Sequence, residues 1–314
     1  MKKKMLLIAG GGTLGRYTAQ QLTADGCEAD ILCLEDHAPR SGVRFIRMDA
    51  TADALARFLQ DRYYDGIVNF IHYTSVDAYR PVHALLSQKT DHLVFLSSYR
   101  VYADLQHPIT EEAPLLLDTV DDDEFVRTEG YAVPKTQNER FIRTDSGTDN
   151  WTIVRPVISF SDLRLDIVTR SGHEVVTRTR AGQEILLPRA ARDLTAGLDW
   201  AGNSGKLIAR LLQNPAACGE TYTVSSAQNR TWGEVASYYT ECIGARFAWV
   251  DTADYLHDQG LTEMPYGLKY DRLYDRAIDN RKVLDAAGCA AADFTSIRDG
   301  IRMETDRVLR GGTH

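Results

Sequence analysis

The first half of the chain alternates short apolar runs of strand length with segments in which apolar residues recur at helical spacing. The first run, residues 5–9, is continuously apolar and stops at three glycines, as expected for a parallel strand buried on both faces. This alternation predicts a doubly wound parallel sheet with right-handed crossovers, and thus an α/β fold. The predicted strands are 5–9, 29–34, 44–47, 66–71, 92–97 and 152–155, and the predicted helices are 16–24, 52–59 and 79–86.

After residue 156 the pattern weakens. Residues 157–193 mix charged residues with Ser and Thr and predict no clear element. Helical spacing returns at 194–212, residues 220–224 predict one more strand, and the remainder is mainly helical, most clearly at 232–242 and 278–287. We therefore expect two domains. The sheet domain comprises 1–156, joined by 194–225, and a smaller, mainly helical substrate domain comprises 157–193 and 226–314.

Composition and charge narrow the class of protein. The chain has 314 residues, of which 44% are hydrophobic and 25% charged, as in an ordinary globular protein. Asp and Glu outnumber Lys and Arg by 44 to 36, which argues against a broad surface for nucleic acid or an anionic membrane. The five scattered cysteines form no CxxC pair and have no zinc-binding spacing, so we expect no metal and a reducing compartment. With neither a signal-peptide nor a membrane-span pattern, the prediction is a cytoplasmic protein.

A glycine-rich turn follows the first predicted strand and opens the first predicted helix. Residues 10–15, Gly-Gly-Gly-Thr-Leu-Gly, fit the pattern GxGxxG, and this context makes it a dinucleotide-binding fingerprint of a Rossmann-type sheet. One glycine permits the tight turn, one lets backbone N–H groups approach a pyrophosphate, and the last permits close packing of helix on sheet. The phosphates then lie at the positive end of the helix. The predicted contacts are Gly10, Gly12, Thr13, Leu14 and Gly15.

The end of the second strand indicates which dinucleotide binds. Glu35 lies twenty residues beyond the last glycine of the loop, with Asp36 beside it. A carboxylate there accepts hydrogen bonds from the ribose hydroxyls and repels a 2′-phosphate, which favours NAD. Arg16 and Arg40 leave NADP open, because a guanidinium suits a phosphate. Asp49, after the third strand, either accepts from the adenine amine or caps a helix.

A second motif lies between the fifth and sixth strands. Tyr131 and Lys135 form a YxxxK pair, and residues four apart on a helix address the same side. Pro134 between them is tolerable only if Tyr131 lies at the first turn, since proline donates no backbone hydrogen bond. Upstream, Ser97 and Ser98 end the fifth strand at the carboxyl edge of the sheet, where ligands bind in such folds.

These features together resemble the extended short-chain dehydrogenase/reductase family, in particular its NAD-dependent epimerase/dehydratase branch. The resemblance covers most of the chain. In residues 9–15 it matches the GxxGxxG loop of that branch, with Ala9 in place of the first glycine. The other segments that resemble the branch are 65–71, the Ser-rich strand and Val-Tyr of 95–102, and residues 108–112, 155–156 and 278–282.

The resemblance implies a role for each matching residue. Four positions before Tyr102, it assigns the catalytic hydroxyl to Ser98, with Tyr131 as general acid/base and Lys135 as its support. A free phenol has a pKa near ~10, so a neighbouring ammonium and the positive nicotinamide ring are needed to favour phenolate. The implied cofactor contacts also include Ala50, Phe70, Tyr131 and Lys135, and the implied substrate contacts are Ser98 and Tyr99.

Three departures from the branch bear on the substrate. Dehydratases have Asp-Glu directly after the catalytic hydroxyl, and this chain has Tyr99-Arg100, which argues against dehydration by that route. Residues 200–203, Trp-Ala-Gly-Asn, replace a His-Val-Asp-Asp-like helix start, and residues 157–159 lack the usual asparagine. Arg272 and Arg276 either bind a substrate diphosphate or are solvated helix charges.

The leading hypothesis is an NAD-dependent sugar-nucleotide epimerase that acts through a transient keto intermediate. An alternative within enzymes is an NAD(P)-dependent reductase or dehydrogenase with an exchangeable cofactor. An alternative from another class is a non-catalytic nucleotide-binding regulatory protein, against which the complete triad and the acidic net charge argue. The resemblance further implies a homodimer packed through two helices per subunit, and no nucleic-acid or membrane partner is expected.

Overall fold

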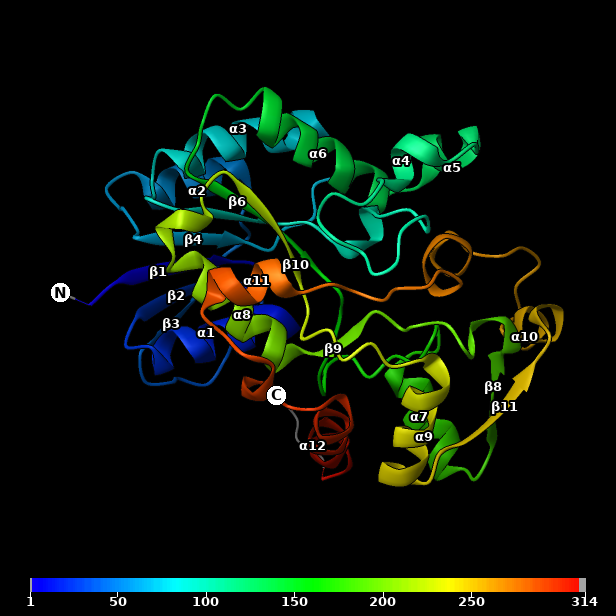
Figure 1. The fold of residues 1–314 in the computed structure, drawn as a ribbon. Coiled ribbons are helices and arrows are strands. Elements are labelled where there is room, and N and C mark those ends of the chain that lie inside the picture. The colour runs from blue at the N-terminus through cyan, green and yellow to red at the C-terminus, as the bar shows by residue number, and fades with distance from the viewer. Residues whose placement is uncertain (1, 311–314) are drawn as a thin grey trace.

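The computed structural model describes residues 2–310 and divides them between a large parallel sheet and a smaller second part (Figure 1). The sheet has the strand order β10-β6-β5-β4-β1-β2-β3, and all its neighbouring strands are parallel. This confirms the predicted doubly wound, Rossmann-type sheet. Its strands are β1 (Lys4–Ile8), β2 (Glu28–Cys33), β3 (Val43–Arg47), β4 (Gly66–Asn69), β5 (Leu93–Leu96), β6 (Trp151–Pro156) and β10 (Glu220–Val224).

Helices cover both faces of this sheet, which is why a central strand such as β1 is apolar from Met5 to Ile8. Along β1, Met5 and Leu7 pack on one face, whereas Leu6 and Ile8 pack on the other. The first face carries α1 (Thr13–Ala24), α8 (Ala201–Leu212) and α11 (Arg281–Ala287). The opposite face carries α2 (Ala52–Leu59), α3 (Val76–Ser87) and α6 (Ala132–Thr144).

The second part is mainly helical, as predicted, and it also contains two short parallel sheets that the sequence pattern did not reveal. In one, β7 (Ile158–Phe160) pairs with β9 (Leu198–Trp200), and in the other, β8 (Glu184–Pro188) pairs with β11 (Arg246–Val250). Its helices are α7 (Gly172–Arg180), α9 (Trp232–Ile243), α10 (Thr252–Asp258) and α12 (Ile297–Leu309). Two further short helices, α4 (Leu116–Thr119) and α5 (Asp123–Thr128), lie between β5 and α6.

Two predicted helices begin later than their sequence pattern indicates. The helix predicted at 194–212 begins only at Ala201, because residues 198–200 form β9 and Gly197 has a φ of 50°. The helix predicted at 278–287 begins at Arg281, since Ile278 forms a β-bridge with Ile109. In both cases the segment has helical spacing, but β-pairing with a segment distant in sequence holds it in an extended conformation.

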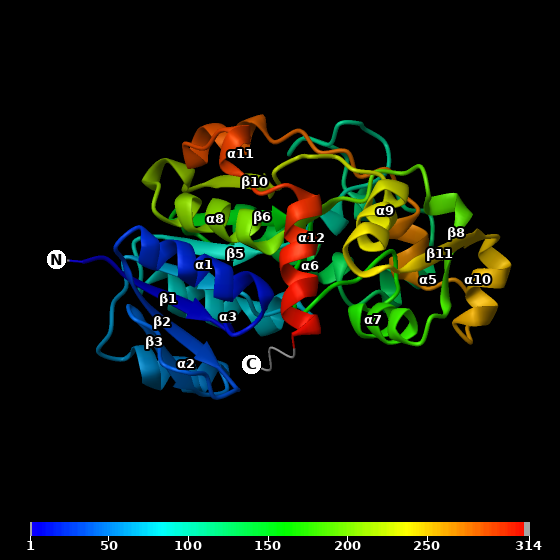
Figure 2. The ribbon, with the colours of Figure 1, turned by 90° about the horizontal axis from the view of Figure 1, so that it is seen from below.

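The C-terminal helices return to the sheet part. Although α11 lies in the range predicted for the substrate domain, Val283 and Ala287 pack in the core between α8 and the sheet. In Figure 2, α12 lies between the two parts. There the buried Glu304 carboxylate accepts hydrogen bonds from Tyr17 of α1 and from the indole of Trp200, the latter at 2.7 Å. Trp200, the first residue of the segment that replaces the His-Val-Asp-Asp-like helix start, is thus tied to α12.

Candidate active site

The glycine loop is so tightly folded that two of its glycines have no room for a side chain. A Cβ on Gly15 would lie 2.3 Å from the carbonyl oxygen of Gly10, and a Cβ on Gly10 would lie 2.7 Å from the Cβ of Leu7. The preceding Ala9 has a φ of 56°, in the left-handed region that favours glycine. The backbone therefore explains why the GxxGxxG pattern has its first glycine where this chain has alanine.

Gly12, in contrast, faces open space. No atom lies within 4 Å of the position that its Cβ would occupy. It precedes α1, a helix of 12 residues whose N-terminus has no side-chain cap and no acidic residue in its first turn. Unpaired backbone N–H groups and the positive end of the helix dipole favour an anion there. The loop thus fits the pyrophosphate of a dinucleotide.

Two cavities share this loop as a wall, and we name each after one of its residues. The Tyr131 cavity has a volume of about 420 Å³, and the Glu35 cavity one of about 580 Å³. Of the residues predicted from the sequence, the Tyr131 cavity is lined by Gly12, Thr13, Leu14, Gly15, Phe70, Ser98, Tyr99, Tyr131 and Arg272. The Glu35 cavity is lined by Gly12, Glu35, Asp49, Ala50 and Phe70. Only Gly10, Asp36 and Lys135 of the predicted set line neither cavity.

The acidic residues at the ends of β2 and β3 differ in their surroundings. All three are exposed, but Glu35 and Asp49 line the Glu35 cavity, whereas Asp36 forms an ion pair with Arg47 at 2.8 Å. The capping alternative for Asp49 is wrong, because Thr51 is the N-cap of α2 and accepts from the backbone of Ala54. Of the two arginines that left NADP open, Arg16 pairs with the Asp162 carboxylate, and neither Arg16 nor Arg40 lines the Glu35 cavity.

The helix that carries Tyr131 and Lys135 begins at Ala132, with Tyr131 at its N-cap. Pro134 is therefore in the first turn, where no backbone N–H is needed, as predicted. The buried carboxylate of Glu129 accepts hydrogen bonds from the backbone N–H groups of Tyr131 and Val133 at 2.9 and 3.0 Å. Glu129 thus holds the start of α6, a role that sequence reasoning missed.

Tyr131 and Lys135 have very different environments. The Tyr131 side chain lines the cavity, with the residue 36% exposed, whereas Lys135 is 1% exposed and does not line it. The Lys135 ammonium donates to the carbonyl oxygen of Leu96 at the end of β5 and lies 5.1 Å from the centre of the Phe95 ring. Burial lowers the pKa of Lys135 to about 8, opposed by the negative charge of Glu139.

This shift predicts how stability depends on pH. Because the pKa of Lys135 is lower in the folded protein, the unfolded chain binds more protons between about pH 8 and pH 10.5, so folding gains stability as pH rises. Comparing pH 7 with pH 10.5, we expect wild type to gain about 3 kcal/mol more than Lys135→Met. Urea unfolding at both pH values measures this. Lys3→Met, at an exposed lysine, should leave the pH dependence unchanged, and a Lys135→Met curve parallel to wild type would contradict the expectation.

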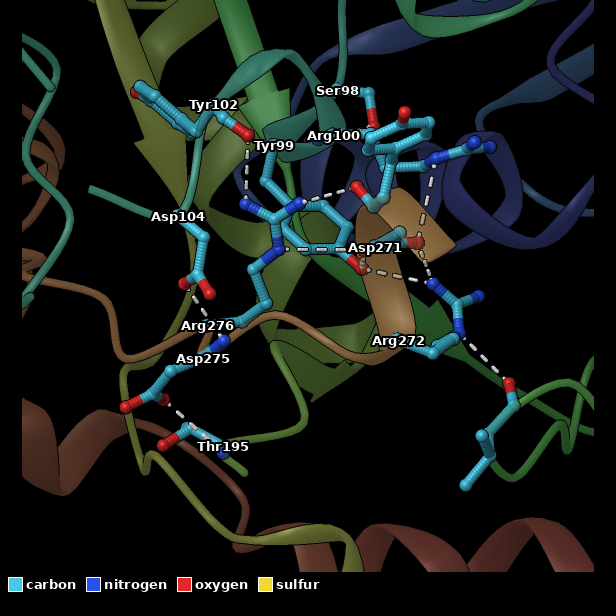
Figure 3. Close-up of polar contacts among 12 residues, drawn as sticks. Ser98, Tyr99, Arg100, Tyr102, Asp104, Thr195, Asp271, Arg272, Asp275 and Arg276 are labelled. Atoms are coloured by element: carbon cyan, nitrogen blue, oxygen red, sulfur yellow. Dashed lines mark hydrogen bonds and ion pairs between the residues drawn. The ribbon is translucent and has the colours of Figure 1, made fainter. Parts of the chain in front are cut away.

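Arg272 and Arg276 belong to a buried network around Asp271, and the alternative of solvated helix charges is wrong for both (Figure 3). Arg276 is 1% exposed, and its terminal nitrogens donate to the carbonyl oxygens of Tyr102 and Tyr270 at 3.0 and 3.2 Å. It lines neither cavity, because these contacts turn it into the interior.

Arg272 is the member of this pair that reaches the Tyr131 cavity. Its Nε donates to the Val168 carbonyl oxygen at 2.9 Å, and its Nη1 contacts the Asp271 carboxylate and the Tyr99 hydroxyl. The Tyr99 hydroxyl in turn donates to Asp271 at 2.5 Å. Tyr99, predicted as a substrate contact, thus lines the cavity and also holds the network in place.

Several cavity residues were not predicted as site residues. Arg100 and Arg164 line the Tyr131 cavity, as does Ser97, whose buried hydroxyl has no hydrogen-bond partner. Arg100 lies in η1 (Tyr99–Val101), the turn capped by Ser98. The sequence did contain a signal for Arg100, because Tyr99-Arg100 stands where dehydratases have Asp-Glu. Arg164 comes from an irregular segment with no such signal.

Residues 2–310, which the structure describes, contain neither a membrane span nor a metal-binding cluster. None of their helices combines the length and the apolar character that a membrane span requires. Within the same range, no three His, Cys, Asp or Glu side chains gather where a metal ion could be held.

A parallel doubly wound sheet, a glycine loop at a helix N-terminus and a cavity beside a YxxxK helix define a dinucleotide-dependent enzyme of the Rossmann class. Residues 6–225 match the NAD dependent epimerase/dehydratase family, and the chain belongs to it. This membership confirms the predicted class of enzyme and NAD as its cofactor. No curated protein sequence matches the chain.

Solved structures share the fold over nearly the whole chain. The epimerase Mth375 of Methanothermobacter thermautotrophicus has a TM-score of 0.73 at 14% identity, covering 98% of this chain and 92% of its own. MoeE5 in complex with UDP-glucose and NAD has a TM-score of 0.71 at 14% identity, covering 99% and 100%. WbmG of Bordetella bronchiseptica, in complex with NAD and UDP, has a TM-score of 0.71 at 17% identity, covering 99% and 96%. At these identities the likeness is one of fold.

Proposed function

We propose that the protein is an NAD-dependent sugar-nucleotide epimerase that acts through a transient keto intermediate. The observation that carries this proposal is a single cavity lined by the glycine loop, Ser98 and Tyr131, with Lys135 on the same helix as Tyr131. Similar folds bind UDP-glucose with NAD in MoeE5 and UDP with NAD in WbmG, which supports a sugar nucleotide as the substrate.

In this proposal the two cavities divide the cofactor and the substrate between them. Gly12, Thr13 and Leu14 hold the pyrophosphate of NAD, and Glu35 accepts hydrogen bonds from the adenosine ribose. Asp49, Ala50 and Phe70 complete the adenosine side. When bound, NAD supplies the acceptor, and afterwards the donor, of a hydride.

The chain's own groups move the proton. The Tyr131 phenol oxygen takes the proton of a substrate hydroxyl as that carbon is oxidised, and returns it when the carbon is reduced. The Ser98 hydroxyl hydrogen-bonds the same substrate oxygen and holds it in line with Tyr131. The buried charge of Lys135 favours the phenolate form, and lowering a phenol pKa by about three units corresponds to roughly 4 kcal/mol.

Epimerisation also requires the keto group to turn over inside the cavity. Val157 and Ile158 line its wall at the end of β6, where relatives have an asparagine, and they offer the sugar no polar side chain. Such a wall lets the ring reorient at little cost in hydrogen bonds. In this proposal the absence of the asparagine therefore makes it easier for the sugar ring to reorient.

The test of the function combines bound cofactor with turnover. We expect nucleotide released from the denatured protein to be NAD at close to one per chain, by mass spectrometry. With a sugar-nucleotide substrate, we expect its epimer to form with no net absorbance change at the NADH wavelength. Stoichiometric NADH formation would instead establish the exchanging dehydrogenase, and NADP in the released nucleotide would refute the weight given to Glu35.

The division into domains and the homodimer stay predictions. For the former, we propose that 157–193 and most of 226–314 shape the substrate end, with α11 kept in the sheet part because it packs on α8 and β10. For the latter, the mass of the purified protein in solution decides between one and two chains.

A further inference from the structure

The Tyr131 cavity has a positive wall in a protein whose net charge is −8. Three arginines line it, Arg100, Arg164 and Arg272, and no Asp or Glu of the described chain does so. Arg164 pairs with Asp166 at 2.9 Å outside the cavity lining. Because a cavity with charged walls of one sign concentrates ions of the other sign, these arginines favour a ligand with several negative charges.

The carboxylates that pair with these arginines lie behind the wall, outside the cavity lining. Arg100, Arg272 and Arg276 all face one carboxylate, Asp271, which Figure 3 shows at the centre of the network. The second carboxylate, Glu129, lies 3.2 Å from Arg100 and also accepts the two backbone N–H groups at the start of α6. Three guanidinium groups thus share two carboxylates, one of which also neutralises a helix N-terminus. A third carboxylate, Asp104, acts electrostatically on Arg276 and also contacts His107 at 3.1 Å.

Arg100 brings a positive charge to the reacting end of the cavity. Its guanidinium carbon lies 4.8 Å from the centre of the Tyr131 ring. Its Nε is buried and has no hydrogen-bond partner, since Asp271 is 3.5 Å away at ion-pair distance only. The side chain is 21% exposed and lines the cavity. Nη2 donates to Glu129 and the buried Nε faces Asp271, so Nη1 is the guanidinium nitrogen of Arg100 that is left for a ligand beside the Tyr131 ring.

We infer that Arg100 binds an anionic substituent, a carboxylate in the simplest case, on the sugar ring of the substrate. This inference rests on the proposed function and narrows its substrate class to acidic sugar nucleotides. A charge-assisted hydrogen bond from the guanidinium attracts the carboxylate and is about twice as strong as one between neutral groups. In this arrangement Arg272 and Arg164 bind the diphosphate that every sugar nucleotide carries.

A matched pair of probes tests the inference, because UDP-glucuronic acid and UDP-glucose differ only in a carboxylate against a hydroxymethyl group. We expect wild type to bind the acid about 10-fold more tightly by calorimetry, and Arg100→Gln to reduce this preference to less than 2-fold. UDP alone carries the diphosphate without the sugar, and it should bind wild type and Arg100→Gln alike. A loss of UDP affinity equal to that of the acid would assign Arg100 to the diphosphate and overturn the inference.

Two further variants keep the test decisive. Arg100→Lys keeps the charge of the buried network and should fold even if Arg100→Gln does not, and it should retain part of the preference. Arg164→Gln removes one positive charge from another part of the wall and should weaken both sugar nucleotides equally. Equal affinity of wild type for the two probes, or binding of neither, would overturn the inference. Preferential binding of the acid without epimer formation would support Arg100 and reject the proposed reaction.

Discussion

Tyr131→Phe is expected to lower kcat for sugar-nucleotide turnover by about 10²- to 10⁴-fold, the usual contribution of a positioned acid/base group. The substitution removes one oxygen atom, and with it the only phenol of the cavity that has no carboxylate partner, since the Tyr99 hydroxyl donates to Asp271. Initial rates of epimer formation by chromatography measure the effect. Tyr131 is at the N-cap of α6 and partly exposed, so the protein should fold normally.

The control for this experiment is Tyr63→Phe, the same chemical change at an exposed tyrosine whose hydroxyl donates to Asp91 at 2.8 Å. It should leave the rate unchanged. Full activity in Tyr131→Phe would remove Tyr131 from the mechanism and, with it, the proposed epimerase chemistry. A lower rate with unaltered circular dichroism and melting temperature would separate loss of chemistry from loss of fold.

Gly15→Ala is expected to abolish NAD retention and to lower the free energy of unfolding by about 1–3 kcal/mol or more. The added Cβ would lie 2.3 Å from the carbonyl oxygen of Gly10, so backbone must move, and α1 must shift away from the loop. The nearest obstacles are backbone atoms, which cannot rotate aside as a side chain can. The two readouts are NAD per chain in the purified variant and its urea unfolding curve.

Alanine variants of two other glycines distinguish an effect on packing from an effect on cofactor binding. Gly12→Ala adds a Cβ in open space, so it should keep the stability of wild type and still lose NAD if the pyrophosphate approaches that backbone. Gly267→Ala also has open space, at a φ of −64°, and should change neither property. Normal NAD content in both Gly12→Ala and Gly15→Ala would place the cofactor away from the loop.

The periodicity of the chain predicted the sheet part well because its elements depend on local pattern. A parallel strand covered on both faces is apolar throughout, and helices such as 52–59 show one apolar side, so both signals lie within a few residues. The strands of the second part are different. In β7 and β9 only three residues each pair across a separation of forty positions, and neither has a pattern of its own.

The candidate site shows the same difference between features that local pattern predicts and features that it does not. The sequence by itself determined the glycine loop, Glu35 and the Tyr131–Lys135 pair, because a turn, a strand end and one helical turn each fix such residues relative to their neighbours. Only the tertiary structure decided that Lys135 is buried and has a lowered pKa, and that Arg272 faces the cavity whereas Arg276 does not. Likewise, Arg100 pairs with Glu129, 29 residues away in the sequence, and with Asp271 of η4 (Leu268–Arg272). The physical reason is that burial and charge pairing depend on which distant segments fold against a residue. The local spacing of residues does not determine those segments.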